Sequence, residues 1–102
     1  MNVARLQAIQ QHFREHPETC DMEKFDPNNP GNHGCGCIAG FAQTLFGRPW
    51  FRVIGIEDYE DADRKLCQLQ SWPAQFQAAY RADKAQATID RIQHFIDTDG
   101  KE

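Results

Sequence analysis

The sequence predicts an all-α fold, a compact bundle of four or five short helices in one domain that spans residues 1–102. Apolar residues recur at intervals of three and four in several separate segments, which is the spacing of one face of an α-helix. Turn-forming residues separate these segments, including a long Gly/Asn/Pro-rich loop before the helix that we expect at the centre. The one short segment with extended character, residues 50–56, has no second strand to pair with. A sheet is therefore not expected.

The first and last helices are predicted from apolar stripes with clear ends. The first is expected from Asn2 to His16, because Pro17 lacks an amide hydrogen and disfavours helix in the residue before it. The last is expected from about Asp83 to Asp97, with Gly100 after its end. The stripes consist of Val3, Leu6, Ile9 and Phe13 in the first helix and of Ala85, Ile89, Ile92 and Ile96 in the last, with Phe95 beside it.

A long connection leads into the expected central helix. Residues 18–36 are rich in turn formers, and a loop of this length in a small domain is expected to be either functional or mobile. The second helix should begin near Cys37 and end at Gly47, with Pro49 following. Almost no charge interrupts its pattern, so we expect it to be the most buried helix. Its apolar positions are Ile38, Phe41, Ala42, Leu45 and Phe46.

A packed loop and two more helices are expected between the central and last helices. Residues 50–56 should form the loop, a third helix should run from Glu57 to about Gln70, and a further helix should start at Ser71-Trp72-Pro73 with Ser71 near its cap. The residues expected to be buried are Trp50, Phe51 and Ile54 in the loop, Tyr59, Ala62, Leu66 and Leu69 in the third helix, and Trp72, Phe76, Ala79 and Tyr80 in the next.

Composition and charge exclude several classes of protein. Hydrophobic residues make up 40% of the chain and charged residues 25%, as in globular proteins. The net charge of −4 argues against direct binding of nucleic acid, because such proteins usually carry a basic face. No apolar run reaches the ~20 residues that cross a bilayer, and the first residues do not read as a signal peptide. We therefore expect a cytoplasmic protein with reduced thiols and no membrane contact.

The cysteines leave three alternatives open around residues 32–37. In the first and favoured one, glycines let the loop turn into the central helix and Cys37 is a small buried hydrophobe. In the second, Cys20, His33, Cys35 and Cys37 hold zinc, although the single residue between the last two crowds chelation. In the third, Cys35 or Cys37 is a reactive thiolate at a helix N-terminus, but catalysis would also need a positioned histidine. We assign no catalytic residue, no metal ligand and no cofactor.

An acidic run opens the expected third helix. Negative charge is favourable at a helix N-terminus, so a solvated helix start accounts for the run. The sharper hypothesis is a partner-binding face for a basic surface, such as the nucleic-acid-binding groove of a host protein. The candidate partner-binding residues are Glu57, Asp58, Glu60 and Asp61, and the residues that would extend the face, if the fold brings them near, are Asp21, Glu23 and Asp26.

Several short motifs follow one another along the chain. They are the Arg5-Leu6 helix ending in His16-Pro17-Glu18, then Asp21-Met22, Cys37-Ile38-Ala39-Gly40 at a helix start, Ala62-Asp63-Arg64-Lys65-Leu66 within a helix, Trp72-Pro73, and the closing Arg91-Ile92-Gln93-His94-Phe95-Ile96. In this order they resemble a group of small, mostly uncharacterised proteins of phages, prophages and bacteria. Relatives in that group often carry a second cysteine five residues before the Cys-Ile-Ala-Gly stretch, where this chain has Asn32. The resemblance implies an all-α, phage-linked accessory protein and implies no reaction.

Two functional hypotheses of different classes result. The first is a small phage- or prophage-type accessory protein that binds a host protein without catalysis, a component of a defence system being one candidate target. The alternative is a metal- or thiol-dependent module built on Cys20, His33, Cys35 and Cys37. A homodimer is compatible with either, because small helical domains often bury leftover apolar surface in that way.

Overall fold

The computed structural model describes all residues, 1–102, and confirms the all-α prediction, with six α-helices and no strand. The four longer helices are α1 (Val3–Glu15), α2 (Ile38–Phe46), α5 (Ala74–Ala82) and α6 (Lys84–Asp97), and the two single turns are α3 (Trp50–Val53) and α4 (Tyr59–Ala62). The remaining helical turns are the 3₁₀ helices η1 (Pro17–Thr19), η2 (Pro30–Asn32) and η4 (Leu69–Ser71), and the π-helix η3 (Asp63–Cys67). None of the helices combines the length and apolarity needed to cross a membrane.

The ends of the longer helices follow from local chemistry. Asn2 caps α1 by accepting a hydrogen bond from the Arg5 amide at 3.1 Å, and Asp83 caps α6 in the same way through the Gln86 amide at 3.2 Å. Gly47 adopts a φ of 99° at the end of α2, a conformation that a residue with a Cβ rarely takes. The sequence-based boundaries of these three helices are therefore correct to within a residue or two.

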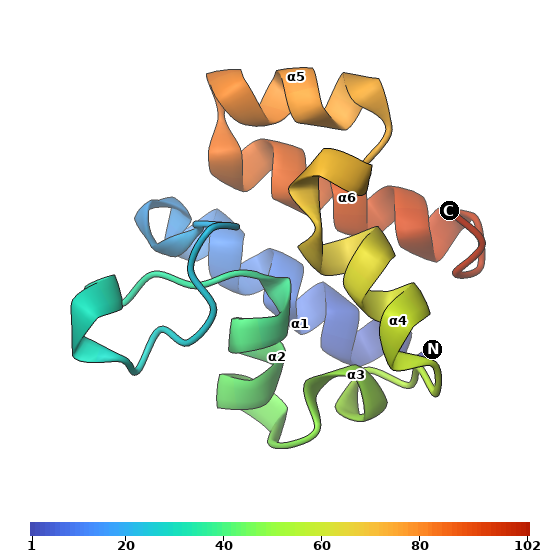
Figure 1. Cartoon of the computed structure of the whole chain (residues 1–102), viewed down its shortest axis with the longest axis horizontal. Helices are drawn as coiled ribbons and strands as arrows, with labels where there is room; N and C mark the ends of the chain where they lie inside the picture. The colour runs from blue at the N-terminus through green and yellow to red at the C-terminus, as the bar shows by residue number, and fades with distance from the viewer.

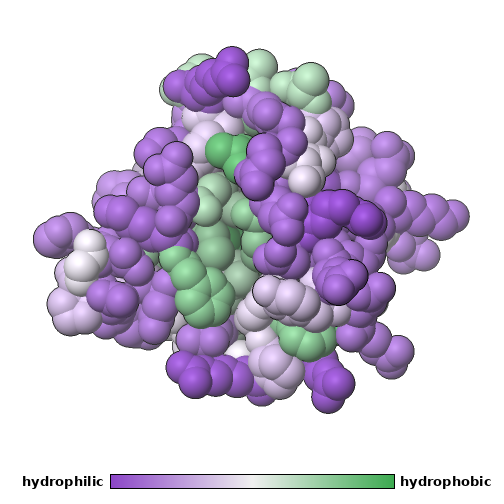
Figure 2. Space-filling model, viewed as in Figure 1, coloured by the Kyte–Doolittle hydropathy of each residue, from purple (hydrophilic) through white to green (hydrophobic).

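The helices close over one cluster of 21 buried apolar side chains. α5 and α6 lie antiparallel at one side of the molecule, and α1 packs against the other face of α6 (Figure 1). Gln10 ties α1 to α6 from within, since its Nε2 donates to the Ile89 carbonyl at 3.1 Å and to Gln93 Oε1 at 3.2 Å. Figure 2 shows an apolar strip across the middle of one face, bordered by hydrophilic side chains.

Only the first half of α2 is central. Ile38 and Ala42 are completely buried, whereas Leu45 is 43% exposed and Phe46 is half-buried. As predicted, α2 has the largest share of buried residues among the longer helices, but its last turn is exposed.

The connection between α1 and α2 is held to the body at several points. Cys20 and Gly36 form an isolated bridge, in which the Asp21 amide donates to the Gly36 carbonyl at 3.0 Å and the Gly36 amide to the Thr19 carbonyl at 2.9 Å. The Met22 amide donates to the Tyr80 hydroxyl at 2.9 Å. Each of these hydrogen bonds joins the connection to itself or to α5, so it is a folded part of the structure.

Two segments differ from the sequence-based expectation. Residues 50–56 contain the single helical turn α3 where a packed loop was expected, because Pro49 precedes a turn that Gly55, with a φ of 81°, ends. The expected third helix continues from α4 into the π-helix η3 and ends at Cys67, where the Gln68 amide donates to the Asp63 carbonyl at 2.9 Å, a π-type hydrogen bond. The chain then enters η4, so Ser71 lies in a 3₁₀ turn and Pro73 stands at the start of α5.

Candidate functional site

The candidate partner-binding residues all lie at the start of α4, and the fold uses two of them. The Asp58 carboxylate caps α4 by accepting from the amides of Glu60 at 3.0 Å and Asp61 at 3.3 Å. The Asp61 carboxylate lies 2.8 Å from the Arg64 guanidinium and 3.0 Å from the Lys65 ammonium group. These two carboxylates therefore have structural roles at the start of the helix.

The other two acidic residues have no such role. Glu57 and Glu60 are exposed, and their carboxylates make no hydrogen bond or ion pair within the chain. The structure therefore divides the predicted face into a structural half, Asp58 and Asp61, and a free half, Glu57 and Glu60. Only the free half offers unpaired negative charge to another molecule.

Tyr59 lies between Glu57 and Glu60 in the sequence and is 51% exposed. Its ring packs edge-on against Phe51 and Trp50, with ring centroids 5.4 and 6.3 Å away. The expectation that Tyr59 faces the core is therefore wrong, because its side chain is half exposed and only the edge contacts with Phe51 and Trp50 are made inside the protein. We call Trp50, Phe51, Glu57, Tyr59 and Glu60 the acidic corner.

Two solvent-open hollows adjoin the acidic corner. One, of about 630 Å³, is lined by Arg52, Gly55, Ile56 and Glu57. The second, of about 280 Å³, lies between the same turn and the end of α6, and Phe95 and Gly100 contribute to its wall. Such open hollows suit the side chains of a partner better than a small ligand, which usually needs a more enclosed site.

The proposed extension of the acidic face does not lie beside it. Asp21, Glu23 and Asp26 belong to the connection before α2, which projects from the opposite side of the molecule to α4 (Figure 1). The Asp21 and Asp26 carboxylates are also occupied by local turns, since they accept from the Glu23 amide at 3.0 Å and from the Asn28 amide at 2.9 Å.

The four residues of the zinc hypothesis do not form a metal-binding site. No group of three or more His, Cys, Asp or Glu side chains is placed to hold a metal ion, and all four cysteines are free thiols. Cys20 donates to Thr88 Oγ1 at 3.3 Å, and Cys35 lies 3.4 Å from the Glu18 carbonyl. His33 is exposed with a φ of 51°.

No histidine hydrogen-bonds to a cysteine. His12 pairs with Thr19 Oγ1 at 3.2 Å and stacks on Phe41, and His94 lies 4.0 Å from the Glu102 carboxylate. Burial, with a contribution from nearby His16, lowers the pKa of His12. The cysteine–histidine arrangement that nucleophilic catalysis needs is therefore not formed by these residues.

A cysteine that the zinc and thiol hypotheses left out lies near Cys37. Cys67 is the last residue of η3 and a neighbour of Cys37, the N-cap residue of α2, whose side chain makes no capping hydrogen bond. The neighbouring Cys67 thiol and the amides at the start of α2 lower the pKa of Cys37 against the opposing effect of burial. The neighbouring Cys37 thiol, together with burial, raises the pKa of Cys67 well above its usual value.

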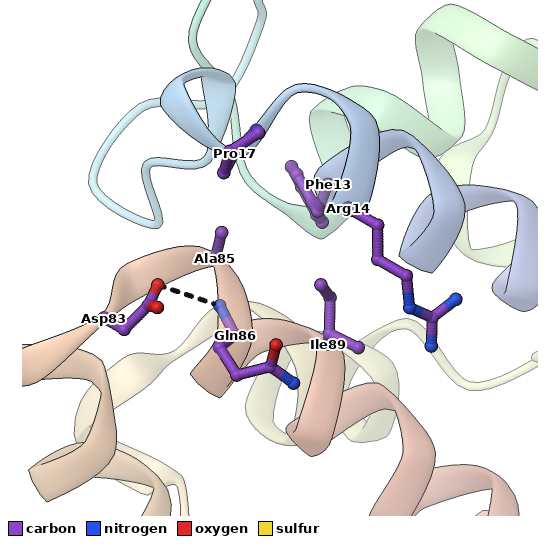
Figure 3. Close-up of a pocket in the computed structure, with 7 residues that line it drawn as sticks. All are labelled: Phe13, Arg14, Pro17, Asp83, Ala85, Gln86 and Ile89. Atoms are coloured by element: carbon purple, nitrogen blue, oxygen red, sulfur yellow. Dashed lines mark hydrogen bonds between the residues drawn. The ribbon is translucent and has the colours of Figure 1, made fainter.

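A separate groove of about 240 Å³ lies between the end of α1 and the start of α6 (Figure 3). Phe13, Ala85 and Ile89 give it an apolar floor, and Arg14 stands at its edge. Because the Asp83 carboxylate already caps α6 at this point, the positive end of that helix is occupied by the chain itself. The groove therefore lacks the converging free polar groups that mark a ligand site.

Comparison of the chain with protein-family models, with curated proteins and with solved structures finds no match.

Proposed function

We propose that this chain is a small accessory protein that acts by binding a basic surface of another protein through the acidic corner, without catalysis of its own. The observation that carries the proposal is the half-exposed Tyr59 between Glu57 and Glu60, two carboxylates that the fold itself does not use.

Tyr59 has the character of an interface anchor. Tyrosine is among the residues enriched at the energetic centres of interfaces, because its ring offers apolar area and its hydroxyl a hydrogen bond. Packing against Phe51 and Trp50 holds the ring in place before a partner arrives. A side chain that is already ordered loses less conformational entropy on binding.

The free carboxylates supply the electrostatic part of recognition. Glu57 and Glu60 would steer a partner with clustered Lys and Arg side chains toward Tyr59 and would oppose acidic partners. Self-association through this corner is disfavoured, since a two-fold contact would place the carboxylates of both copies together. A homodimer, if one forms, should therefore use another face.

The resemblance to phage and prophage proteins suggests a host protein as the partner. A nucleic-acid-binding groove presents the required basic surface, and a host defence protein that acts on nucleic acid is one candidate target. The order of the sequence motifs supports a host protein as the partner, and the negative charge of the acidic corner supports a basic surface on it.

The test compares proteins captured from a bacterial host extract by four immobilised forms of the chain. They are the wild type, Tyr59→Ala, the double variant Glu57→Lys/Glu60→Lys, and the control double variant Glu18→Lys/Glu23→Lys, which makes the same charge change at exposed positions near η1 and the connection. Asp58 and Asp61 stay unchanged because they stabilise α4.

The proposal expects a protein that wild type and control retain and that both corner variants lose by at least about tenfold, as the removal of an anchor worth ~1.4 kcal/mol or more requires. Circular dichroism must show that all four forms are folded. Equal capture by the wild type and both corner variants would exclude the acidic corner as the contact surface.

A further inference from the structure

A buried arginine in α6 has too few hydrogen-bond acceptors around it. Arg91 is 1% exposed, and its Nε and Nη1 atoms make no hydrogen bond. Only Nη2 has a partner, the main-chain oxygen of Glu102. Buried polar groups are almost always hydrogen-bonded, and an unpaired buried charge is especially unfavourable. Packing alone therefore does not account for Arg91.

The surroundings of Arg91 point to a ligand. We propose that Arg91 and His94 form a binding site for a small dicarboxylate with the carbon spacing of glutamate, and that Glu102 occupies this site when the ligand is absent. The proposal rests on the unpaired nitrogen atoms of Arg91 and on the way Glu102 spans the two basic side chains. It concerns a ligand of this chain and does not depend on the acidic corner.

The missing partner of Arg91 is an acceptor. Its Nε and Nη1 carry only donor hydrogens, and no Asp or Glu side chain forms an ion pair with it. Burial lowers the pKa of Arg91, and the charge of Glu102 opposes this effect only in part. An anion that accepts hydrogen bonds from the guanidinium group would supply both the missing acceptor and the missing charge.

A phenylalanine of α5 lies beside both basic side chains. The Arg91 Cζ lies 5.7 Å from the centroid of the Phe76 ring, and the ring centroid of His94 lies 5.3 Å from it. Arg91 and His94 are also three residues apart in α6, so they share one face of that helix. Phe76 therefore packs against two basic groups on the same face of α6.

Glu102 shows which ligand fits this pair. Its main-chain oxygen accepts from Arg91 Nη2, and its Oε1 lies 4.0 Å from His94 Nε2. Glutarate has the same carbon chain between its two carboxylates as a glutamate residue has between its main-chain and side-chain carbonyl groups. A carboxylate near Arg91 can also accept two N–H groups at once, which is the preferred pairing of a guanidinium group. A dicarboxylate would therefore pair nitrogen that Glu102 leaves free.

Glu102 can be displaced without a change in the core. The chain turns back after α6 (Figure 1), and Gly100 in this turn has a φ of 78°. Lys101 and Glu102 are exposed, and their amides are held by Thr98, through its carbonyl at 3.1 Å and its Oγ1 at 3.0 Å. Opening the site therefore breaks these two hydrogen bonds and the contact with Arg91, while the buried apolar cluster stays in place.

The test follows the Nε–H signal of Arg91 by nuclear magnetic resonance in the full-length protein. The signal is assigned by its loss in Arg91→Lys. Glutarate, butyrate and sodium chloride are added at matched ionic strength, at about pH 6, where an ordinary histidine is mostly protonated. Glutarate should shift the signal saturably, butyrate should bind about threefold more weakly because it does not reach His94, and sodium chloride should cause no saturable shift.

Four variants test the roles of the residues by calorimetric titration with glutarate. Arg91→Met places an apolar side chain of similar length in the core and should weaken binding at least about tenfold. Arg81→Met changes an exposed arginine of α5 and should bind as the wild type does. His94→Gln should bind glutarate and butyrate equally. Glu102→Gly should bind glutarate more tightly than the wild type, because the competing side chain is gone.

A clear set of results would overturn the proposal. They are an Arg91 signal that glutarate does not shift, an equal response to glutarate and sodium chloride, or equal affinities of folded Arg91→Met and the wild type for glutarate. The Arg91 signal is read in the wild type, so it decides the matter even if Arg91→Met does not fold. None of these measurements involves a partner protein, so their outcome is separate from that of the capture experiment.

Discussion

Gly40 in α2 offers the most direct test of how the connection before α2 is held. A Cβ atom added at Gly40 would lie 1.6 Å from the Phe25 carbonyl oxygen, 2.7 Å from its carbonyl carbon and 3.2 Å from Pro27 Cδ. Two of these three atoms belong to the backbone and cannot turn away as the end of a side chain could. The substitution Gly40→Ala must therefore push the connection away from α2.

The change in the free energy of unfolding that Gly40→Ala causes is the sum of two opposing contributions. Alanine favours the helix over glycine by about 1 kcal/mol. The Phe25 carbonyl, however, must retreat by roughly 1.5–2 Å to reach ordinary contact distance, and overpacking of this kind costs about 1–3 kcal/mol and sometimes more. Because the displaced segment carries the Cys20–Gly36 bridge, we expect the upper end of that cost. Gly40→Ala should lose about 2 kcal/mol, or roughly 10 °C in melting temperature.

Thermal unfolding followed by circular dichroism measures the loss, and limited trypsinolysis locates it. Cleavage after Lys24, which precedes Phe25, should become faster as the connection loosens. Gly31→Ala is the matched control in the same connection, because its Cβ would meet only the flexible Asn29 side chain at 3.4 Å. A Gly40→Ala protein as stable as Gly31→Ala, with Lys24 equally protected, would refute the close contact between the connection and α2.

Two further predictions concern the segments on either side of α2. Tyr80→Phe leaves the Met22 amide without its acceptor and should cost about 1–3 kcal/mol in urea unfolding, whereas Tyr59→Phe, whose hydroxyl makes no hydrogen bond, should cost almost nothing. Burial lowers the pKa of His12, so a proton binds more readily to His12 in the unfolded chain than in the folded protein. The stability that neutral His12 contributes is therefore complete above pH 6.5, the pKa of the unfolded chain, and is lost as the pH falls through the lower pKa of the folded protein. The difference in unfolding free energy between wild type and His12→Gln should therefore shrink on acidification from about pH 7.5 to pH 5, and a constant difference would contradict that assignment.

The helix boundaries were predictable where a single residue determines the conformation of the backbone beside it. Asn2, Pro17 and Asp83 act on the backbone next to them, so the boundaries of α1 and α6 could be read from single residues. The apolar stripe of α6 also pointed correctly to the core, because a helix packed on two sides buries most of its apolar positions.

The acidic corner was predictable only in part. Its charge is visible in the sequence, but the structural use of Asp58 and Asp61 depends on where α4 begins and on which cations reach it. Exposure of Tyr59 depends on Trp50 and Phe51, which occupy the inner position that helical spacing assigns to Tyr59. Competition between aromatic rings for one place in the core is a tertiary effect, and the spacing within one helix does not contain it.

The place of Cys67 near Cys37 was missed for a reason that lies in helix geometry. With Ala62 facing the core of a regular α-helix, Cys67, five residues later, would point about 140° away from it. The π-type hydrogen bond from the Gln68 amide to the Asp63 carbonyl widens the turn in η3, which reduces that angle. The position of Cys67 therefore does not follow the α-helical spacing. Periodicity with 3.6 residues per turn assigns Cys67 to the flank of the helix, so a sequence pattern that predicts the core residues Ala62 and Leu66 correctly still separates the two thiols.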